Sequence, residues 1–376
     1  MLVGASQTDI TPELPFPMQG HYYLRMGNRI LDPICASCVI IDDGSNAIVI
    51  VSCDLSGISE ADALDVRNMI SEKTGISAKS ILITATHTHQ APIMIDDDKD
   101  VIPWCRRDEK KHRKLLDGIV SSAQEAYRNR IPARMGYGRG EVEKCGFNRR
   151  YIMSDGKSMM NPFGKDNPDR LMVEGPVDKE VQVVWFEDMS GELISVMVNH
   201  ACHPVTLIDS LMVSADFPGE MRNIIKTVFD RNIPVLFLQG AAGNIDTYDF
   251  ENDDAWGKDL SGYKRIGRIM AGEVIKIISS GYAGNEHDIK LQTENVTLQL
   301  PYKQLDERKV LDVISEWNSL SEEDKENLDF DKKAHDTRLM HLHDMIKKNG
   351  KHPTEISVVK INDLILVTIP GEYFVE

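Results

Sequence analysis

Two pairs of histidines follow short apolar runs in this sequence, and imidazole side chains are common ligands of transition metals. His87 and His89 come directly after the apolar run 80–85, and His200 and His203 stand at the end of a later run. On extended backbone, residues two apart face the same side, so His87 and His89 are expected to approach one ion together. Either pair alone is also typical of polar residues hydrogen-bonded in a loop. Two such pairs, each after a buried-type strand, favour a metal site.

A catalytic zinc site usually has three protein ligands and one open position, so two histidines and one carboxylate would be sufficient. Residue spacing does not choose the carboxylate. The carboxylates that remain open are Asp54, Asp216, Asp246 and Glu372. The residues that would support the ligands from behind, or help to hold a second ion in a two-metal hydrolase, are Asp54, His200, Asp216 and Asn244.

Two further features could meet the oxygen atoms of a substrate. The glycine-rich loop 240–243 could present backbone N–H groups to an oxyanion, or it could be only a tight turn after a strand. Arg149 and Arg150 form a small basic cluster, and either could hold a carbonyl or lie in solvent. The sequence contains neither a G-x-S-x-G nor an H-E-x-x-H motif, so serine-hydrolase and metzincin mechanisms have no support.

Buried strands and helices must position these residues. The run 47–51 predicts a strand, 59–74 has helical spacing, and 80–85 predicts the next strand. Strand, helix and strand in this order are the signature of a parallel βαβ unit. The runs 181–186 and 193–198 flank a short polar turn and predict a hairpin.

The remaining elements complete an α/β protein. Helices are predicted at 108–130, 217–229 and 263–278, and strands at 235–238, 296–300 and 364–367. The pattern predicts a mixed, largely parallel β-sheet core flanked by helices. In such sheets ligands collect at the carboxyl ends of the strands, where the polar residues are found. We expect a single domain over 1–376, with a polar helical excursion at 306–350.

Composition and charge restrict the class of partner. The 376 residues include 43 Lys and Arg against 59 Asp and Glu, a formal net charge of −16. This acidity argues against a nucleic-acid partner, which requires a basic surface. No apolar run approaches the roughly 20 residues of a membrane-spanning helix, and the first residues lack the apolar core of a signal peptide. We therefore expect a cytoplasmic protein with reduced cysteines; the oligomeric state is not indicated.

A series of short motifs runs along nearly the whole chain in a defined order. They are Gly4-Ala-Ser-Gln-Thr-Asp9-Ile10-Thr11, Thr86-His87-Thr88-His89, Asn148-Arg149, Ala201-Cys202-His203, Ser214-Ala215-Asp216, the loop 239–244, and Pro370-Gly371-Glu372. Their order and spacing resemble the N-terminal catalytic domain of the neutral/alkaline non-lysosomal ceramidases.

The resemblance implies a particular metal site. One zinc ion would be bound by His87, His203 and Glu372, with His89 beside the zinc-bound water and Arg149 on the substrate carbonyl. In the family a tyrosine beyond the glutamate is the fourth ligand, and an immunoglobulin-like domain follows. This sequence ends at Glu376, so the resemblance predicts a catalytic domain that is C-terminally incomplete relative to the family.

Two segments depart from the family pattern. The family's Gly-Asp-Val-Ser-Pro-Asn is Gly-Asn-Ile-Asp-Thr-Tyr at 243–248, and its Gly-Pro-Gly-Gly run is replaced at 90–94. We therefore predict a zinc-dependent hydrolase that cleaves an amide (N-acyl) bond of a small-molecule or lipid substrate by attack of zinc-bound water, and leave the substrate open. The alternatives are a non-catalytic metal- or ligand-binding homologue and a two-metal ester or amide hydrolase.

Overall fold

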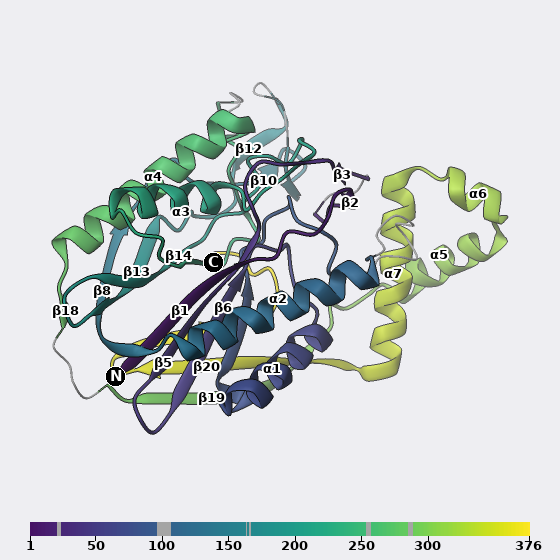
Figure 1. Ribbon diagram of the computed structural model, residues 1–376. Coiled ribbons are helices and arrows are strands. Elements are labelled where there is room, and N and C mark those ends of the chain that lie inside the picture. Colours follow the sequence, from purple (N-terminus) through teal and green to yellow (C-terminus); the bar gives the residue numbers. More distant parts are fainter. Residues whose placement is uncertain (21–23, 96–106, 163, 165–166, 253–256, 285–288) are drawn as a thin grey trace.

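A large mixed β-sheet forms the centre of the protein (Figure 1). The computed structural model describes residues 1–20, 24–95, 107–162, 164, 167–252, 257–284 and 289–376. In spatial order the strands of this sheet are β16 (Val235–Gln239), β14 (Leu193–His200), β13 (Glu180–Asp188), β8 (Ile131–Glu141), β1 (Leu2–Asp9), β5 (Cys35–Asp42), β6 (Ala47–Cys53) and β7 (Ile81–Ala85), with β18 (Ala283–Gly284) paired to β8.

The two ends of this sheet are parallel and its centre is antiparallel. β6 pairs parallel with β7 around α1 (Glu60–Thr74), and β14 pairs parallel with β16 around α3 (Phe217–Val228). The other described pairs of the sheet are antiparallel. The mixed α/β class with flanking helices is confirmed, but the pairing is mainly antiparallel where a largely parallel core was expected.

The connections between the strands explain this difference. Asp43 accepts backbone hydrogen bonds from Ser45 and Asn46 in the turn between β5 and β6, and a turn this short can join only antiparallel neighbours. The turn after β13 does the same, and the predicted hairpin is confirmed. Strands buried on both faces have the same apolar sequence in either orientation, so the sequence alone did not distinguish them.

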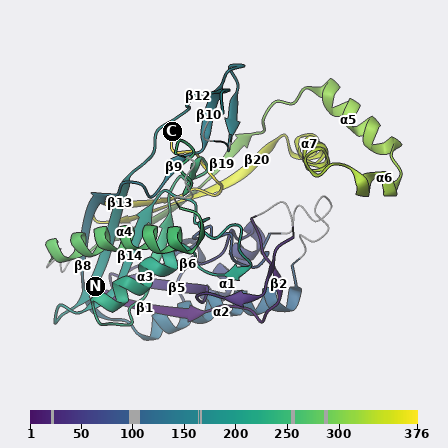
Figure 2. The same ribbon diagram turned by 90° about the horizontal axis from the view of Figure 1, so that it is seen from above.

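Four helices cover one face of the sheet. Alternate side chains of each strand point to opposite faces, so each strand contributes apolar residues both to the helix-covered face and to the other face. These helices are α1, α2 (Glu109–Arg128), α3 and α4 (Asp259–Ser280), and they match the four helices expected from the sequence. On β5, Cys38 and Ile40 pack in a cluster with residues of α1 and α2, whereas Val39 and Ile41 belong to a cluster on the other face. Figure 2 shows the helices on one side of the sheet and β19 and β20 on the other.

A second sheet covers the other face. It consists of β19 (Leu291–Pro301), β20 (Lys351–Ile361) and β21 (Leu364–Thr368), and Leu291, Val359 and Ile361 pack against the large sheet. Between β19 and β20 the chain forms three helices, α5 (Glu307–Ser319), α6 (Glu322–Asn327) and α7 (Phe330–Asn349). In both views these helices project from the rest of the protein, in the segment expected as a helical excursion (Figures 1 and 2).

The large sheet curls so that strands from its two ends come together. The hydroxyl group of Ser52, on β6, donates a hydrogen bond to the carbonyl of Phe237 on β16 at 2.6 Å. The side-chain amide of Gln239, at the end of β16, donates to the carbonyl of Thr86 at 3.2 Å. The loops that follow β7, β14 and β16 therefore meet at one place, although their strands lie at opposite ends of the sheet order.

The remaining short strands surround this meeting point. They are β2 (Phe16–Pro17) with β3 (Met26–Gly27), β4 (Arg29–Ile30) with β15 (Met212–Val213), β9 (Phe147–Asn148) with β17 (Ile245–Asp246), and β10 (Arg150–Met153) between β11 (Ser158–Met160) and β12 (Arg170–Val173). A 3-10 turn, Ala78–Ser80, precedes β7. The five described cysteines are free, and Cys105 lies outside the described residues. Among the helices described, none is long and apolar enough to span a membrane.

Candidate metal centre

His87 lies in the loop after β7, in a backbone conformation that the sequence pattern did not predict. Its φ angle is 71°, in the left-handed region that residues other than glycine rarely adopt. The two histidines of this loop therefore converge through a turn and not through the alternation of an extended strand. The backbone N–H of His87 donates to the carbonyl of Leu55 at 2.9 Å, and its ring nitrogen Nδ1 lies 2.6 Å from the carbonyl of Ser56.

His203 lies in the loop after β14 and is held in the same way. Its backbone N–H donates to the carbonyl of Ile245 at 3.2 Å. Its ring Nδ1 lies 2.6 Å from the carbonyl of Ala242 and 3.1 Å from that of Ile245. A carbonyl only accepts, so both His87 and His203 carry their ring proton on Nδ1. In the neutral form, each ring then presents the lone pair of Nε2 to the site.

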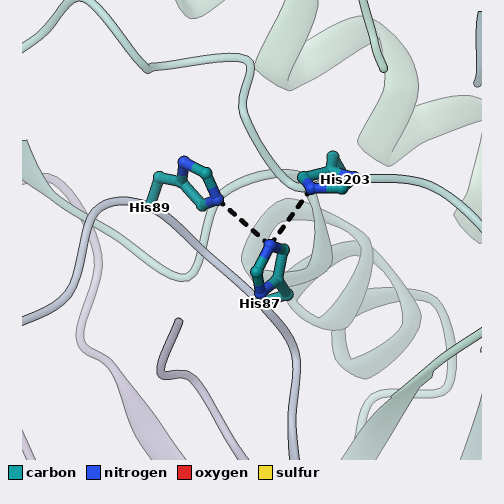
Figure 3. A group of neighbouring side chains, drawn as sticks. All are labelled: His87, His89 and His203. Carbon is teal, nitrogen blue, oxygen red and sulfur yellow. Dashed lines mark hydrogen bonds between the residues drawn. The ribbon is translucent and has the colours of Figure 1, made fainter. Parts of the chain in front are cut away.

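The two lone pairs face each other. The Nε2 atoms of His87 and His203 are 3.1 Å apart, and the Nε2 of His89 is 3.2 Å from that of His87 (Figure 3). Burial, together with the nearby His203, lowers the pKa of His87 to about 4, so its ring is neutral at pH 7. Two neutral nitrogens with facing lone pairs repel each other unless a cation lies between them. Imidazoles whose Nδ1–H groups bind backbone carbonyls are the usual arrangement of metal-binding histidines, so this donor set fits a metal ion.

Glu372 reaches the same point from the C-terminal end of the chain. Its carboxylate oxygens lie 3.6 Å from the Nε2 of His87 and 3.6 Å from that of His203. Two ligand atoms about 2 Å from a tetrahedral ion lie roughly 3.3 Å apart, so these three atoms have the spacing of one face of such a site. The contact with the His203 ring, in its protonated form, is the main influence that lowers the pKa of Glu372 to about 2 in the absence of a metal. The group is therefore an anion at neutral pH.

His89 lies beside the three atoms contributed by His87, His203 and Glu372, and its ring differs from the other two in hydrogen bonding. Its Nδ1 is buried and has no hydrogen-bond partner among the described residues, so the ring proton is better placed on Nε2, which faces the site. Burial, followed by the nearby rings of His87 and His203, moves the pKa of His89 well below its usual value. The Arg25 guanidinium donates to the carbonyl of His89 at 2.6 Å, and Gly20 lies against the ring. His89 is thus a neutral N–H donor aimed at the centre.

Arg149 supplies the positive charge of the site. Its Nη2 donates to the carbonyl of Gly243 at 2.7 Å and lies 3.3 Å from the Nε2 of His203. Its Nη1 is 3.6 Å from the carboxylate of Asp246. The neighbouring Arg150 points elsewhere and pairs with Glu174.

The loop 240–243 orients these groups through its backbone carbonyls. The carbonyls of Ala242 and Gly243 accept hydrogen bonds from His203 and Arg149. Two of its N–H groups are already used, because Gly240 donates to the carbonyl of His200 and Gly243 donates to that of Tyr373. Backbone carbonyls leave no mark in a sequence, so their part in orienting the histidines had no signal there.

Four other candidate residues form hydrogen bonds or ion pairs with groups other than the histidine cluster. Asp54 accepts from both terminal nitrogens of Arg222 at 3.0 Å, and it also accepts the N–H of Cys35. Asp216 accepts from Thr206 and from the N–H groups of Leu207 and Phe217, and burial raises its pKa. The Nδ1 of His200 lies 2.9 Å from the carbonyl of Glu180. The side chain of Asn244 binds the C-terminal segment of the chain.

These contacts bear on the two-metal alternative. Within the described part of the chain, one cluster of three or more possible metal ligands is found, and it consists of His87, His89 and His203. Asp54 is held in an ion pair, and the oxygens of Asp216 are held by hydrogen bonds, so neither is poised for a second ion.

Fold and site define a mixed α/β protein with a buried histidine cluster of the metal-binding kind. The chain belongs to the neutral/alkaline non-lysosomal ceramidase family, because the model of that family's N-terminal region matches residues 1–230. His87, His89, Arg149 and His203 lie within the match, and Glu372 lies beyond it.

Individual proteins show the same likeness. The chain is 27% identical to the neutral ceramidase of Pseudomonas aeruginosa over 193 residues, which are 49% of this chain and 27% of that protein. It is 26% identical to neutral ceramidase A of Dictyostelium discoideum over 189 residues, 48% of this chain and 25% of that protein. The matched part thus spans about a quarter of the length of these relatives.

Solved structures share the fold. The crystal structure of the Pseudomonas aeruginosa neutral ceramidase matches with a TM-score of 0.72 at 19% identity, covering 100% of this chain and 62% of that chain. A ceramidase complexed with C2 matches with a TM-score of 0.64 at 21% identity, covering 80% of this chain and 46% of that chain.

Proposed function

We propose that this chain is a zinc-dependent amidohydrolase that cleaves the N-acyl bond of a lipid or small-molecule substrate with a zinc-activated water. The observation that carries the proposal is the pair of Nε2 lone pairs of His87 and His203, 3.1 Å apart and backed by carbonyl-bound Nδ1–H groups. Membership of the ceramidase family supports the hydrolase class.

The donor set favours zinc. We assign His87, His203 and Glu372 as the ligands, because two imidazoles and one carboxylate with an open position are a known catalytic zinc set. Bound there, zinc would supply Lewis acidity and lower the pKa of a coordinated water to about 7. The extent of burial agrees with this role, since the side chain of His203 is 2% exposed and that of His87 is 14% exposed.

His89 and Arg149 would act on the substrate carbonyl. The neutral Nε2–H of His89 lies 3.2 Å from the Nε2 of His87, and the guanidinium of Arg149 lies 3.3 Å from the Nε2 of His203. As the amide carbonyl becomes tetrahedral, negative charge grows on its oxygen, and donors already fixed in place stabilise that charge. The bonds of Arg149 to Gly243 and its approach to Asp246 hold the donor in position before the substrate arrives.

The substrate class follows from the relatives. The proteins that this chain resembles are named ceramidases, and ceramide is an N-acyl lipid. We propose an N-acyl amide of this general kind, while the departures at 90–94 and 243–248 leave the headgroup and the chain length open. The cytoplasmic location expected from the sequence stays a prediction.

Turnover tests the proposal. Purified protein, stripped with a chelator and then reloaded with zinc, should release fatty acid from fluorescent short-chain ceramide or from a related N-acyl amide only in the reloaded form. His89→Ala should lower kcat while zinc stays bound. His341→Ala, an exposed histidine on α7, serves as the matched control. Zinc binding without any hydrolysis across an N-acyl amide and ester panel would support the non-catalytic homologue, and two zinc ions per chain would support the two-metal hydrolase.

A further inference from the structure

Glu372 is held in place by different contacts from those that hold the two histidines. His87 and His203 lie in loops at the ends of buried strands, with ring protons bound to backbone carbonyls. The Glu372 side chain is 58% exposed and belongs to the C-terminal strap, which we define as residues 370–376 after β21. The position of its carboxylate therefore depends on what holds the strap.

Asn244 holds the strap through its side chain. It is fully buried, and its Oδ1 accepts the backbone N–H of Val375 at 3.0 Å. Its Nδ2 donates to the two carboxylate oxygens of Glu376 at 3.1 and 3.0 Å. All of the side chain's hydrogen-bonding groups thus face the strap, and its backbone carbonyl accepts from the N–H of Arg149 at 2.8 Å. Asn244 joins the strap to the arginine of the site.

Two neighbouring features make room for the same segment. The N–H of Gly243 donates to the carbonyl of Tyr373 at 2.8 Å. A Cβ atom at Gly243 would lie 2.6 Å from the carbonyl oxygen of Glu372, and the next nearest atoms also belong to the strap. The Arg150 guanidinium lies over the Phe374 ring at 4.6 Å (the C-terminus is marked in Figure 2). Gly243 and Arg150 therefore contact the strap as Asn244 does, and a side chain at position 243 would displace the strap.

We propose that Asn244 is a positioning residue for the metal site, which docks the C-terminal strap and thereby holds the Glu372 carboxylate between His87 and His203. The inference rests on the proposed function, in which Glu372 is a zinc ligand. The side-chain hydrogen bonds of Asn244 go to Val375 and Glu376 and not to an assigned zinc ligand. Its effect passes through Glu372, and this distinguishes it from a residue that merely stabilises the fold.

The test measures zinc affinity by competition with a chromophoric chelator, with the visible spectrum of the cobalt(II)-loaded protein as a second readout. Asn244→Asp keeps the size and the acceptor for Val375 but turns a carboxylate oxygen toward Glu376. Gly243→Ala should displace the strap by a steric clash, because the added Cβ would lie 2.6 Å from the carbonyl oxygen of Glu372. The backbone at Gly243 is not in the left-handed region, so alanine causes no backbone strain there. Asn199→Asp is the matched control, because its amide donates to the carbonyl of Leu238, away from the strap.

We expect Asn244→Asp and Gly243→Ala each to weaken zinc binding about 10–100-fold, as is usual for partners that orient a metal ligand. Both should shift the cobalt spectrum toward that of Glu372→Gln, and Asn199→Asp should leave affinity and spectrum as in the wild type. In a Glu372→Gln background, Asn244→Asp should cause no further loss, because the two changes remove the same interaction.

Two results would overturn the inference while the proposed function stands. One is wild-type zinc affinity in Asn244→Asp, and the other is an equal loss of affinity with and without Glu372→Gln. A wild-type protein that binds neither zinc nor cobalt would instead refute the proposed function, and the inference with it.

Discussion

Replacing Arg149 by glutamine should remove a positive charge and a fixed donor from the site while leaving the three assigned metal ligands in place. Arg149 contributes its Nη2 hydrogen bond to Gly243 at 2.7 Å, a longer one from Nε at 3.2 Å, and the ion pair with Asp246 at 3.6 Å. Loss of one preorganised oxyanion donor lowers kcat by about 10²–10³-fold, or roughly 2.7–4 kcal/mol. We expect a decrease of this size in Arg149→Gln.

The change also acts on stability, and the assay must separate the two effects. The side chain of Arg149 is 14% exposed, so its loss leaves the Gly243 carbonyl with less hydrogen bonding, a penalty of about 1–3 kcal/mol. Rates should therefore be normalised to folded, zinc-loaded protein. Because the lost interaction exists mainly in the transition state, kcat and kcat/KM should fall together.

The outcome discriminates between two roles for this arginine, at the substrate carbonyl and in support of the metal site. Arg139→Gln, on an exposed arginine of β8, is the control and should keep the wild-type rate. A rate within a few-fold of wild type in zinc-loaded Arg149→Gln would refute the assignment of Arg149 to the substrate carbonyl. Loss of zinc in that variant would show that the residue supports the metal site instead.

Three further changes test other parts of the account. Gly20→Ala should lower kcat with zinc retained, because φ at Gly20 is +94° and a Cβ there would lie 2.3 Å from the His89 ring; full activity would contradict the assigned place of His89. Asp54→Asn should lower the free energy of unfolding, measured in urea, by about 3–5 kcal/mol, because it leaves the buried Arg222 charge without its partner. Zinc affinity should not change in this variant, and weaker zinc binding would indicate that Asp54 belongs to the metal site. Burial raises the pKa of Asp32 from 3.8 to about 6, so its contribution to stability is complete below pH 3.8 and is lost as the pH rises through 6. Relative to Asp32→Asn, the wild type should therefore be more stable in urea at pH 4.5 than at pH 7.5, by about 2 kcal/mol, and a constant difference would contradict the raised pKa.

The strand and helix pattern was predictable because it is local. Buried runs such as β6, β7 and β16 and the amphipathic α2 carry their periodicity in the sequence, and the structure confirms them. Strand direction was less accessible, since it depends on whether a turn or a helix makes the connection. The approach of β16 to β6 and β7, which brings the loops together, depends on long-range contacts that no window of sequence contains.

The residues of the candidate site were likewise predictable where the signal is local and not where it depends on long-range contacts. The two histidine pairs were found from their placement after buried strands, and the resemblance selected His87 and His203 as the ligands. Spacing did not select Glu372 over Asp54 or Asp216. A buried carboxylate near a strand end is equally compatible with an ion pair, and the position of Arg222 against Asp54 is visible only in three dimensions. Glu372 was named from the resemblance, and the structure places its carboxylate 3.6 Å from both histidines. Its role as a ligand stays a prediction.

Metal content tests the central claim most directly. Elemental analysis of purified protein after zinc loading and removal of free metal should find about one zinc per chain in the wild type. Zinc should be lost in His87→Ala and in His203→Ala, and it should be kept in His341→Ala. Absence of zinc from the loaded wild type, or full retention in both ligand variants, would contradict the metal centre on which the proposed function depends.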